Sequence, residues 1–104
     1  MKVLYHNIKK YSKLDKFRKL ILYFLVRNLS EEDIAHYHNY FDLFDSKNQG
    51  VITKDGFQNI LSDHLNVDAD SSGKVFENSD LFDNGKMSYT QLISAVIPYT
   101  KFFN

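Results

Sequence analysis

The stretch DSKNQGVITKDGF, residues 45–57, carries the most specific structural signal in this chain. It begins with Asp45, and it places Gly50 at its sixth position and Ile52 at its eighth. A glycine at the sixth position permits a sharp turn, because glycine adopts positive φ without a steric penalty. The apolar eighth residue points toward a core. The stretch therefore predicts a tight polar loop between two helices.

A second stretch, DLFDNGKMSYTQ at residues 80–91, repeats this pattern 35 residues later. The matched pairs of the two stretches are Phe41 and Phe76, Asp45 and Asp80, Gly50 and Gly85, Ile52 and Met87, and Phe57 and Leu92. Two twelve-residue loops of this form, each between apolar helices, are typical of paired EF-hands. We predict an all-α fold with loops at 45–56 and 80–91, joined by a short β-bridge between their eighth positions.

The ligand positions of both loops are poorly filled. Calcium takes six to eight oxygens from loop positions 1, 3, 5, 7, 9 and 12. Lys47 and Phe82 stand at the third positions, and Gly56 and Gln91 at the twelfth. We expect no cofactor, and calcium only at millimolar concentration or not at all. The first-position aspartates are interpreted mainly as residues that end a helix and brace a loop. The weak metal-ligand candidates are Asp45, Thr53, Asp80, Asn84 and Ser88.

The N-terminal segment, residues 1–29, is predicted to form one basic amphipathic helix over residues 8–28. Its apolar residues recur at spacings of three and four, and they include Leu14, Phe17, Ile21 and Phe24. Residues 20–26 are apolar almost all round, which predicts burial on more than one face. Two interpretations stay open and are compatible: an ordinary core helix, or a helix held in the groove of a calmodulin-like domain.

Charge is distributed unevenly along a chain whose net charge is zero. Residues 1–28 hold eight lysines or arginines and one acid, whereas residues 29–104 hold five lysines and twelve acids. Attraction between the two parts is the simplest consequence. We do not expect nucleic acid or a membrane as a partner, although a basic arm that bound either would show strong salt dependence. The longest apolar run, residues 20–26, is too short to span a bilayer.

Residues 30–104 should contain the paired hands. Ser30 and Asp33 approximate a capping box at the start of a helix that runs to Phe44. A short helix is expected after the first loop. A helix over about residues 70–79 is expected before the second loop, and a last helix over residues 89–97 after it. The absence of cysteine excludes disulfides and is compatible with a reducing compartment.

By its motifs the chain resembles the regulatory region of calcium-dependent protein kinases of plants and apicomplexan parasites. LSEEDIAHYHNYFDLFDSKNQGVIT and FENSDLFDNGKMSYTQLISAVI look like the first two EF-hands of the calmodulin-like domain. KYSKLDKFRKLILYFLVRNLSEEDI is similar to the junction that precedes it. The resemblance implies a module whose junction segment restrains a kinase until calcium rearranges it. The family usually has four hands, so we expect a fragment of a larger protein or a divergent member.

The predicted function is that of a non-catalytic, cytoplasmic regulatory domain with degenerate loops. No phosphate-binding loop or catalytic motif is visible, so the chain itself is not expected to be an enzyme. Its expected partners are its own junction helix, a kinase domain, another protein helix, or a second copy. The alternative is a calcium-independent module that grips a partner helix, as myosin light chains do. The residues expected to line the groove are Phe41, Phe44, Ile52, Phe57, Phe76, Met87 and Leu92.

Overall fold

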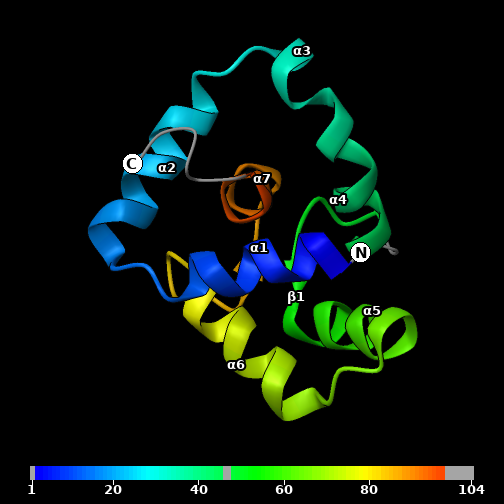
Figure 1. The fold of residues 1–104 in the computed structure, drawn as a ribbon. Helices are drawn as coiled ribbons and strands as arrows, with labels where there is room; N and C mark the ends of the chain where they lie inside the picture. Colours follow the sequence, from blue (N-terminus) through cyan, green and yellow to red (C-terminus); the bar gives the residue numbers. More distant parts are fainter. Residues whose placement is uncertain (1, 46–47, 98–104) are drawn as a thin grey trace.

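The chain folds into helices joined by a short two-stranded bridge (Figure 1). The structure, a computed structural model, describes residues 2–45 and 48–97. The elements are α1 (Lys2–Ser12), α2 (Lys16–Arg27), α3 (Glu31–Ile34), the 3₁₀ turn η1 (Ala35–Tyr37), α4 (His38–Phe44), β1 (Ile52–Thr53), α5 (Lys54–Leu65), α6 (Ala69–Ser79), β2 (Lys86–Met87) and α7 (Tyr89–Val96). The predicted all-α class is confirmed.

Helix α7 forms the centre of the molecule. It is seen nearly end-on in the middle of Figure 1, with α1 just below it in this view. Both α1 and α2 pack against it, and α1 also packs against α6. Every residue from Gln91 to Ile97 is buried, because this segment is apolar on all sides except for Gln91 and Ser94. One hydrophobic core thus includes residues from both predicted segments, 1–29 and 30–104.

The bridge between the two loops has the register that the sequence predicts. Strands β1 and β2 pair antiparallel, with Ile52 opposite Met87 and Thr53 opposite Lys86. Ile52 and Met87 are both fully buried. The eighth positions of the two loops therefore join the loops to each other and to the core.

The N-terminal region differs from the prediction, because two helices replace the single helix expected over residues 8–28. Helix α1 ends at Ser12, whose hydroxyl donates a hydrogen bond to the carbonyl of Lys9 (2.6 Å). Asp15 then starts α2, since its carboxylate accepts a hydrogen bond from the backbone N–H of Arg18 (2.8 Å). An N-cap residue needs an extended backbone conformation, so Asp15 interrupts the helix.

The entering helix of the first hand is divided by a 3₁₀ turn. Its start is as predicted: Ser30 and Asp33 form a capping box, with the hydroxyl of Ser30 accepting from the N–H of Asp33 at 3.2 Å. The turn η1 then tightens the path before α4. The predicted helix to Phe44 is therefore present as three consecutive helical pieces.

Helices α5 and α6 pack closely, and two long side chains of α5 lie against Gly73. A Cβ atom at this position would lie 2.8 Å from the side-chain nitrogen of Gln58 and 3.1 Å from Cε of Lys54. Helix α6 begins at Ala69, slightly earlier than predicted, because the carboxylate of Asp68 accepts from the N–H of Ser71 (2.9 Å). The hydrogen bonds from Ser71 lower the pKa of Asp68.

Candidate functional site

The first loop is closed around the carboxylate of Asp45. This residue ends α4, and its two oxygens accept hydrogen bonds from the N–H groups of Gln49 (2.9 Å) and Gly50 (2.8 Å). Asn48 and Gly50 both have positive φ, 53° and 78°. Asparagine and glycine are the residues that adopt this region most readily. Asp45 therefore does the bracing that the sequence predicts, as well as ending its helix.

The second loop repeats this backbone arrangement. Asp80 ends α6 and accepts from the N–H of Gly85 at 2.6 Å. Asp83 and Gly85 have φ values of 54° and 76° and occupy the same fourth and sixth positions as their counterparts. The side chain of Asn84 accepts from the N–H of Lys86 (3.1 Å). Both loops therefore share one turn geometry, although their sequences differ at most positions.

The ninth-position side chains cap the exiting helices. The hydroxyl of Thr53 accepts from the N–H of Gly56 at 3.2 Å, and that of Ser88 accepts from the N–H of Gln91 at 3.3 Å. The side-chain oxygen of Gln91 accepts in turn from the N–H of Ser88 (2.7 Å), which completes a capping box. Gln91 has the one side-chain oxygen at a twelfth loop position, and this oxygen already accepts a hydrogen bond from the backbone.

The five weak ligand candidates all support their own loops. Asp45 and Asp80 hold backbone N–H groups, Asn84 does the same, and the two hydroxyls cap helices. Within the described ranges, no group of three or more histidine, aspartate or glutamate side chains could hold a metal ion. Lys47 lies outside the described residues. A cavity of about 360 Å³ lies at the first loop, lined by Phe44, Asp45, Gln49, Val51, Thr53, Asp55, Gly56, Asn59 and Ile60. Calcium binding at millimolar concentration or not at all stays a prediction.

The seven predicted groove residues are all buried in the core. They are Phe41, Phe44, Ile52, Phe57, Phe76, Met87 and Leu92. The Phe57 ring stacks on that of Phe44, with 5.4 Å between centroids, and meets that of Phe76 at a tilt, with 5.5 Å between centroids. The same core cluster includes three buried residues of α1: Leu4, Ile8 and Tyr11. The apolar surface of the paired hands is therefore covered by the chain's own first helix.

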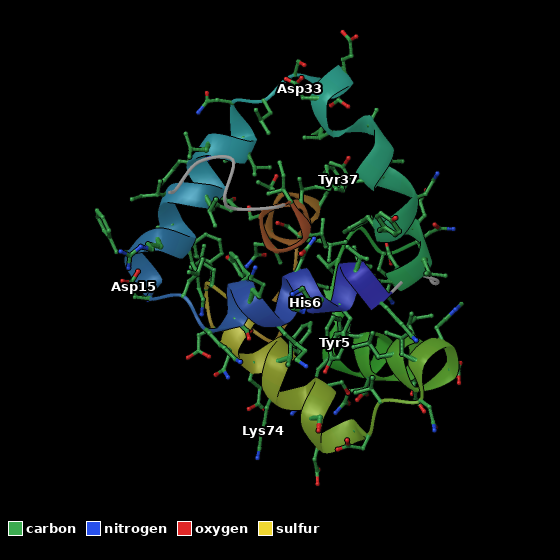
Figure 2. The ribbon with its side chains drawn as sticks, viewed as in Figure 1. Tyr5, His6, Asp15, Asp33, Tyr37 and Lys74 are labelled. Carbon is green, nitrogen blue, oxygen red and sulfur yellow. The ribbon has the colours of Figure 1, made fainter. Side chains whose placement is uncertain are left out.

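A hydrogen bond fixes α1 on the central helix. The side-chain amide of Asn7 donates to the carbonyl of Val96 at 3.0 Å, close to the end of α7. Figure 2 shows α1, with its labelled residues Tyr5 and His6, beside α7, against which it packs. A carbonyl in the last turn of a helix lacks an intrahelical partner, so this bond satisfies a group that would otherwise need water. Burial of its apolar residues and the hydrogen bond from Asn7 together fix the position of α1 on α7.

Helix α2 presents its predicted apolar stripe mainly to the outside. Phe17 is 71% exposed and Phe24 is 55% exposed, while Leu14 and Ile21 are partly buried. The face that reaches the core consists instead of Lys19, Leu22 and Val26. The sequence therefore predicted an apolar helix correctly but placed the wrong face inward. The reason is that residues 20–26 are apolar on both faces, so periodicity alone does not choose between them.

Lys19 joins α2 to the end of α6. Its buried ammonium group donates to the carbonyls of Ser12 (3.1 Å) and Asn78, and it lies 5.7 Å from the centre of the Tyr11 ring. Burial lowers the pKa of Lys19, and the nearby Asp15 opposes this shift. A cation is favourable at the last carbonyls of a helix. Sequence reasoning did not single out Lys19, although a lysine spaced three and seven residues before Leu22 and Val26 was the available signal.

Phe82 has acquired a packing role at a ligand position. Its ring meets that of Tyr23 from α2 edge-on, with centroids 5.3 Å apart. Tyr23 also meets Phe24 at 5.8 Å. The third position of the second loop thus contacts the N-terminal segment instead of offering an oxygen.

Comparison with known proteins finds that the chain is similar to calcium-dependent protein kinases. The resemblance inferred from the sequence is confirmed at this level. The chain is 30% identical over 99 residues to calcium-dependent protein kinase 7 of Oryza sativa subsp. japonica, a match that covers 91% of this chain and 18% of the relative. Calcium-dependent protein kinase 11 of the same plant is 29% identical, with 17% of its length covered.

A third relative, calcium-dependent protein kinase 27 of Arabidopsis thaliana, is 29% identical over 99 residues and is covered over 20% of its length. The chain thus spans at most about a fifth of these kinases. No protein-family model matches it. Among the residues that the structure describes, none of the helices is both long and apolar enough to cross a membrane.

Proposed function

We propose that this chain is a non-catalytic, calmodulin-like regulatory region of a protein related to calcium-dependent protein kinases. In this proposal the paired hands hold the N-terminal segment of the same chain in their apolar groove. The observation that carries the proposal is the burial of Leu4, Ile8 and Tyr11 of α1 in one core with the groove residues. We further propose that the protein works in the cytoplasm, which agrees with the absence of cysteine.

The geometry of the loops supports a module that holds its helix without calcium. The loops are closed by Asp45 and Asp80, whose carboxylates accept backbone N–H groups. The bridge pairs Ile52 with Met87, and both side chains are fully buried. Hydrogen bonds within the loops and burial of the bridge therefore stabilise this shape through groups of the protein itself.

Substitutions at the ligand positions support weak or absent calcium binding. Gly56 provides no side-chain oxygen, and Phe82 packs against Tyr23. The oxygen of Gln91 caps α7. A loss of two ligands at about 1.4 kcal/mol or more each would weaken binding at least about a hundredfold. The expected dissociation constant for calcium therefore lies above the micromolar range of sensor loops.

A chimeric kinase tests the proposal directly. The matched region of calcium-dependent protein kinase 7 of rice would be replaced by this chain, and phosphorylation of a peptide would be measured across calcium concentrations. We expect the chimera to stay less active than the rice kinase at calcium concentrations that activate the latter, because α1 remains in its groove. Full activation at the same calcium concentration would contradict the proposal, as would high activity without calcium.

A matched variant of the chimera separates lost ligands from other defects. It would carry Gly56→Glu, Phe82→Asp and Gln91→Glu, which return oxygens to the third and twelfth positions. We expect this variant to regain part of the calcium response. If it responds no better than the unmodified chimera, the loops are not the reason for the weak response.

A further inference from the structure

Large exposed apolar side chains gather on and beside α2. Among the described residues, five such side chains are exposed, and four of them lie on α2 or in contact with its aromatic residues. We call these four the α2 ridge: Phe17, Phe24, Leu25 and Phe82. The fifth, Val3, lies on α1. Single exposed apolar residues are ordinary, but a group of this kind on one helix indicates an interaction surface.

The α2 ridge is held in place from behind. Phe17 and Phe24 are seven residues apart, which places them on one face two turns from each other. The opposite face of α2 is fixed in the core by Leu22 and Val26, and Lys19 anchors it to α6. Phe82 reaches the ridge from the second loop through its contact with Tyr23. The aromatic side chains are therefore presented by a preformed helix, with no folding step required.

Basic side chains flank the α2 ridge. Lys13 and Lys16 are exposed just before and at the start of α2, and exposed Arg27 lies at its end, 5.8 Å from the centre of the Tyr23 ring. The one acid in this part of the chain, Asp15, forms an ion pair with Arg18 at 2.8 Å. Lys13, Lys16 and Arg27 therefore place positive charge at both ends of α2, while Asp80 and Asp83, on the loop that carries Phe82, line one hollow with Lys16.

We propose that the α2 ridge docks on the surface of an anionic membrane. Exposed phenylalanines between lysines and arginines match the two components of such a surface, the acyl boundary and the negative headgroups. A second copy of this chain fits less well, because a symmetric contact would bring two strongly basic segments together. The sequence alone argued against a membrane partner. The outward position of Phe17 and Phe24 is the observation that changes this expectation.

This proposal does not depend on the proposed regulatory function. The ridge lies on the outer face of α2, whereas the regulatory proposal concerns the groove occupied by Ile8 and Tyr11 of α1. Docking on lipid would use no calcium ligand and would leave the groove covered. A failure of membrane binding would therefore leave the calcium experiment unaffected, and the reverse also holds.

Flotation of the full chain with lipid vesicles tests the proposal. The vesicles would be phosphatidylcholine alone, or phosphatidylcholine with about 30% phosphatidylserine. We expect binding to the anionic vesicles, loss of that binding at high salt, and little binding to the neutral ones. The double variant Phe17→Ala/Phe24→Ala should bind at least about tenfold more weakly, because both anchoring rings are gone.

Matched controls distinguish the ridge from general apolar or basic character. Val3→Ala removes an equally exposed apolar side chain from α1 and should bind as the unmodified chain does. Lys16→Gln should weaken binding, whereas Lys74→Gln should not, since Lys74 lies on the outer side of α6 away from α2 (Figure 2). Circular dichroism would verify the helix content of each variant.

Three results would overturn the proposal. The first is absence of the chain from the floated anionic vesicles. The second is equal binding by the Phe17→Ala/Phe24→Ala variant and the unmodified chain. The third is a dimer in solution that dissociates when Phe17 and Phe24 are replaced, which would assign the ridge to a second copy.

Discussion

Helices α1 and α2 are neighbours with similar compositions, yet they meet the rest of the protein in different ways. Helix α1 buries one stripe, Leu4, Ile8 and Tyr11, and exposes its lysines. Helix α2 is apolar on two sides, so that one side reaches the core and the other carries Phe17 and Phe24 outside. A helix with one apolar face can bury that face completely against the rest of the protein. A helix with two apolar faces buries only one of them in this way, and the other stays exposed and available for an interaction.

The largest expected difference concerns single apolar side chains on the two helices. Ile8→Ala should lower the free energy of unfolding by about 2–5 kcal/mol, because Ile8 is fully buried and its removal leaves a cavity. Phe17→Ala removes a larger side chain but should change stability by no more than about 0.5 kcal/mol. Urea unfolding followed by circular dichroism measures both. A larger loss for Phe17→Ala than for Ile8→Ala would reverse the assignment of the two helices.

Lys19 provides a second test, because it connects α2 to both α1 and α6. Lys19→Met keeps the apolar stem but removes the donor to the carbonyls of Ser12 and Asn78. We expect a loss of about 1–3 kcal/mol from the two unsatisfied acceptors. Lys16→Met, at an exposed position on the same helix, is the control and should have little effect. Equal midpoints in urea for the two variants would show that the anchor contributes nothing.

Asp15 separates the two helices, and its removal should have an intermediate effect. Asp15→Ala deletes the N-cap of α2 and should cost about 1 kcal/mol. The variant also removes the exposed ion pair with Arg18, which adds little because such pairs are worth at most about 1 kcal/mol. Asp15→Ser, which can still cap, should recover most of the loss. A serine variant as unstable as the alanine variant would rule out capping as the cause.

The smallest expected effect at neutral pH is that of Tyr11→Phe. The Tyr11 hydroxyl is buried and has no hydrogen-bond partner within the part of the chain that the structure describes, so its removal breaks no hydrogen bond and should not lower the free energy of unfolding at pH 7. Burial raises the pKa of Tyr11 above its ordinary value of 10.0.

This shift also predicts a dependence on alkaline pH. The unfolded chain releases the Tyr11 proton near pH 10 while the folded chain keeps it, so the unmodified protein loses stability as the pH rises above 10. The Tyr11→Phe variant should lose less over the same range. Denaturant midpoints at pH 7, 10 and 11 measure the difference, and parallel curves for the two proteins would contradict it.

The sequence was most informative where local chemistry and tertiary structure agree. Positions that require one kind of residue were predicted correctly: Gly50 and Gly85 have positive φ, and Ile52 pairs with Met87. The Ser30 capping box was also visible in advance. Each position accepts few residue types: glycine for positive φ, serine for an N-cap and an apolar side chain for the buried bridge. These positions could therefore be recognised without knowledge of distant contacts.

The N-terminal segment was predicted less well, because its local signals conflict. Apolar spacing continues from Tyr11 through Leu14 to Phe17 and suggests one helix, while Asp15 can cap a new one. The buried Lys19 donates to the carbonyl of Asn78, which is 59 residues away in the sequence. Contacts over such distances decide which face of a doubly apolar helix turns inward, and they cannot be inferred from periodicity.

The central claim is that α1 occupies the groove of the paired hands whether or not calcium is present. Nuclear Overhauser contacts between the side-chain amide of Asn7 and the backbone of Val96 and Ile97 would test it, measured with a chelator and again with added calcium. We predict the same contacts in both samples, with the amide signals of Gly50 and Gly85 unmoved at micromolar calcium. Loss of these contacts on adding micromolar calcium, together with a shift of either glycine, would show a working calcium switch and contradict the account.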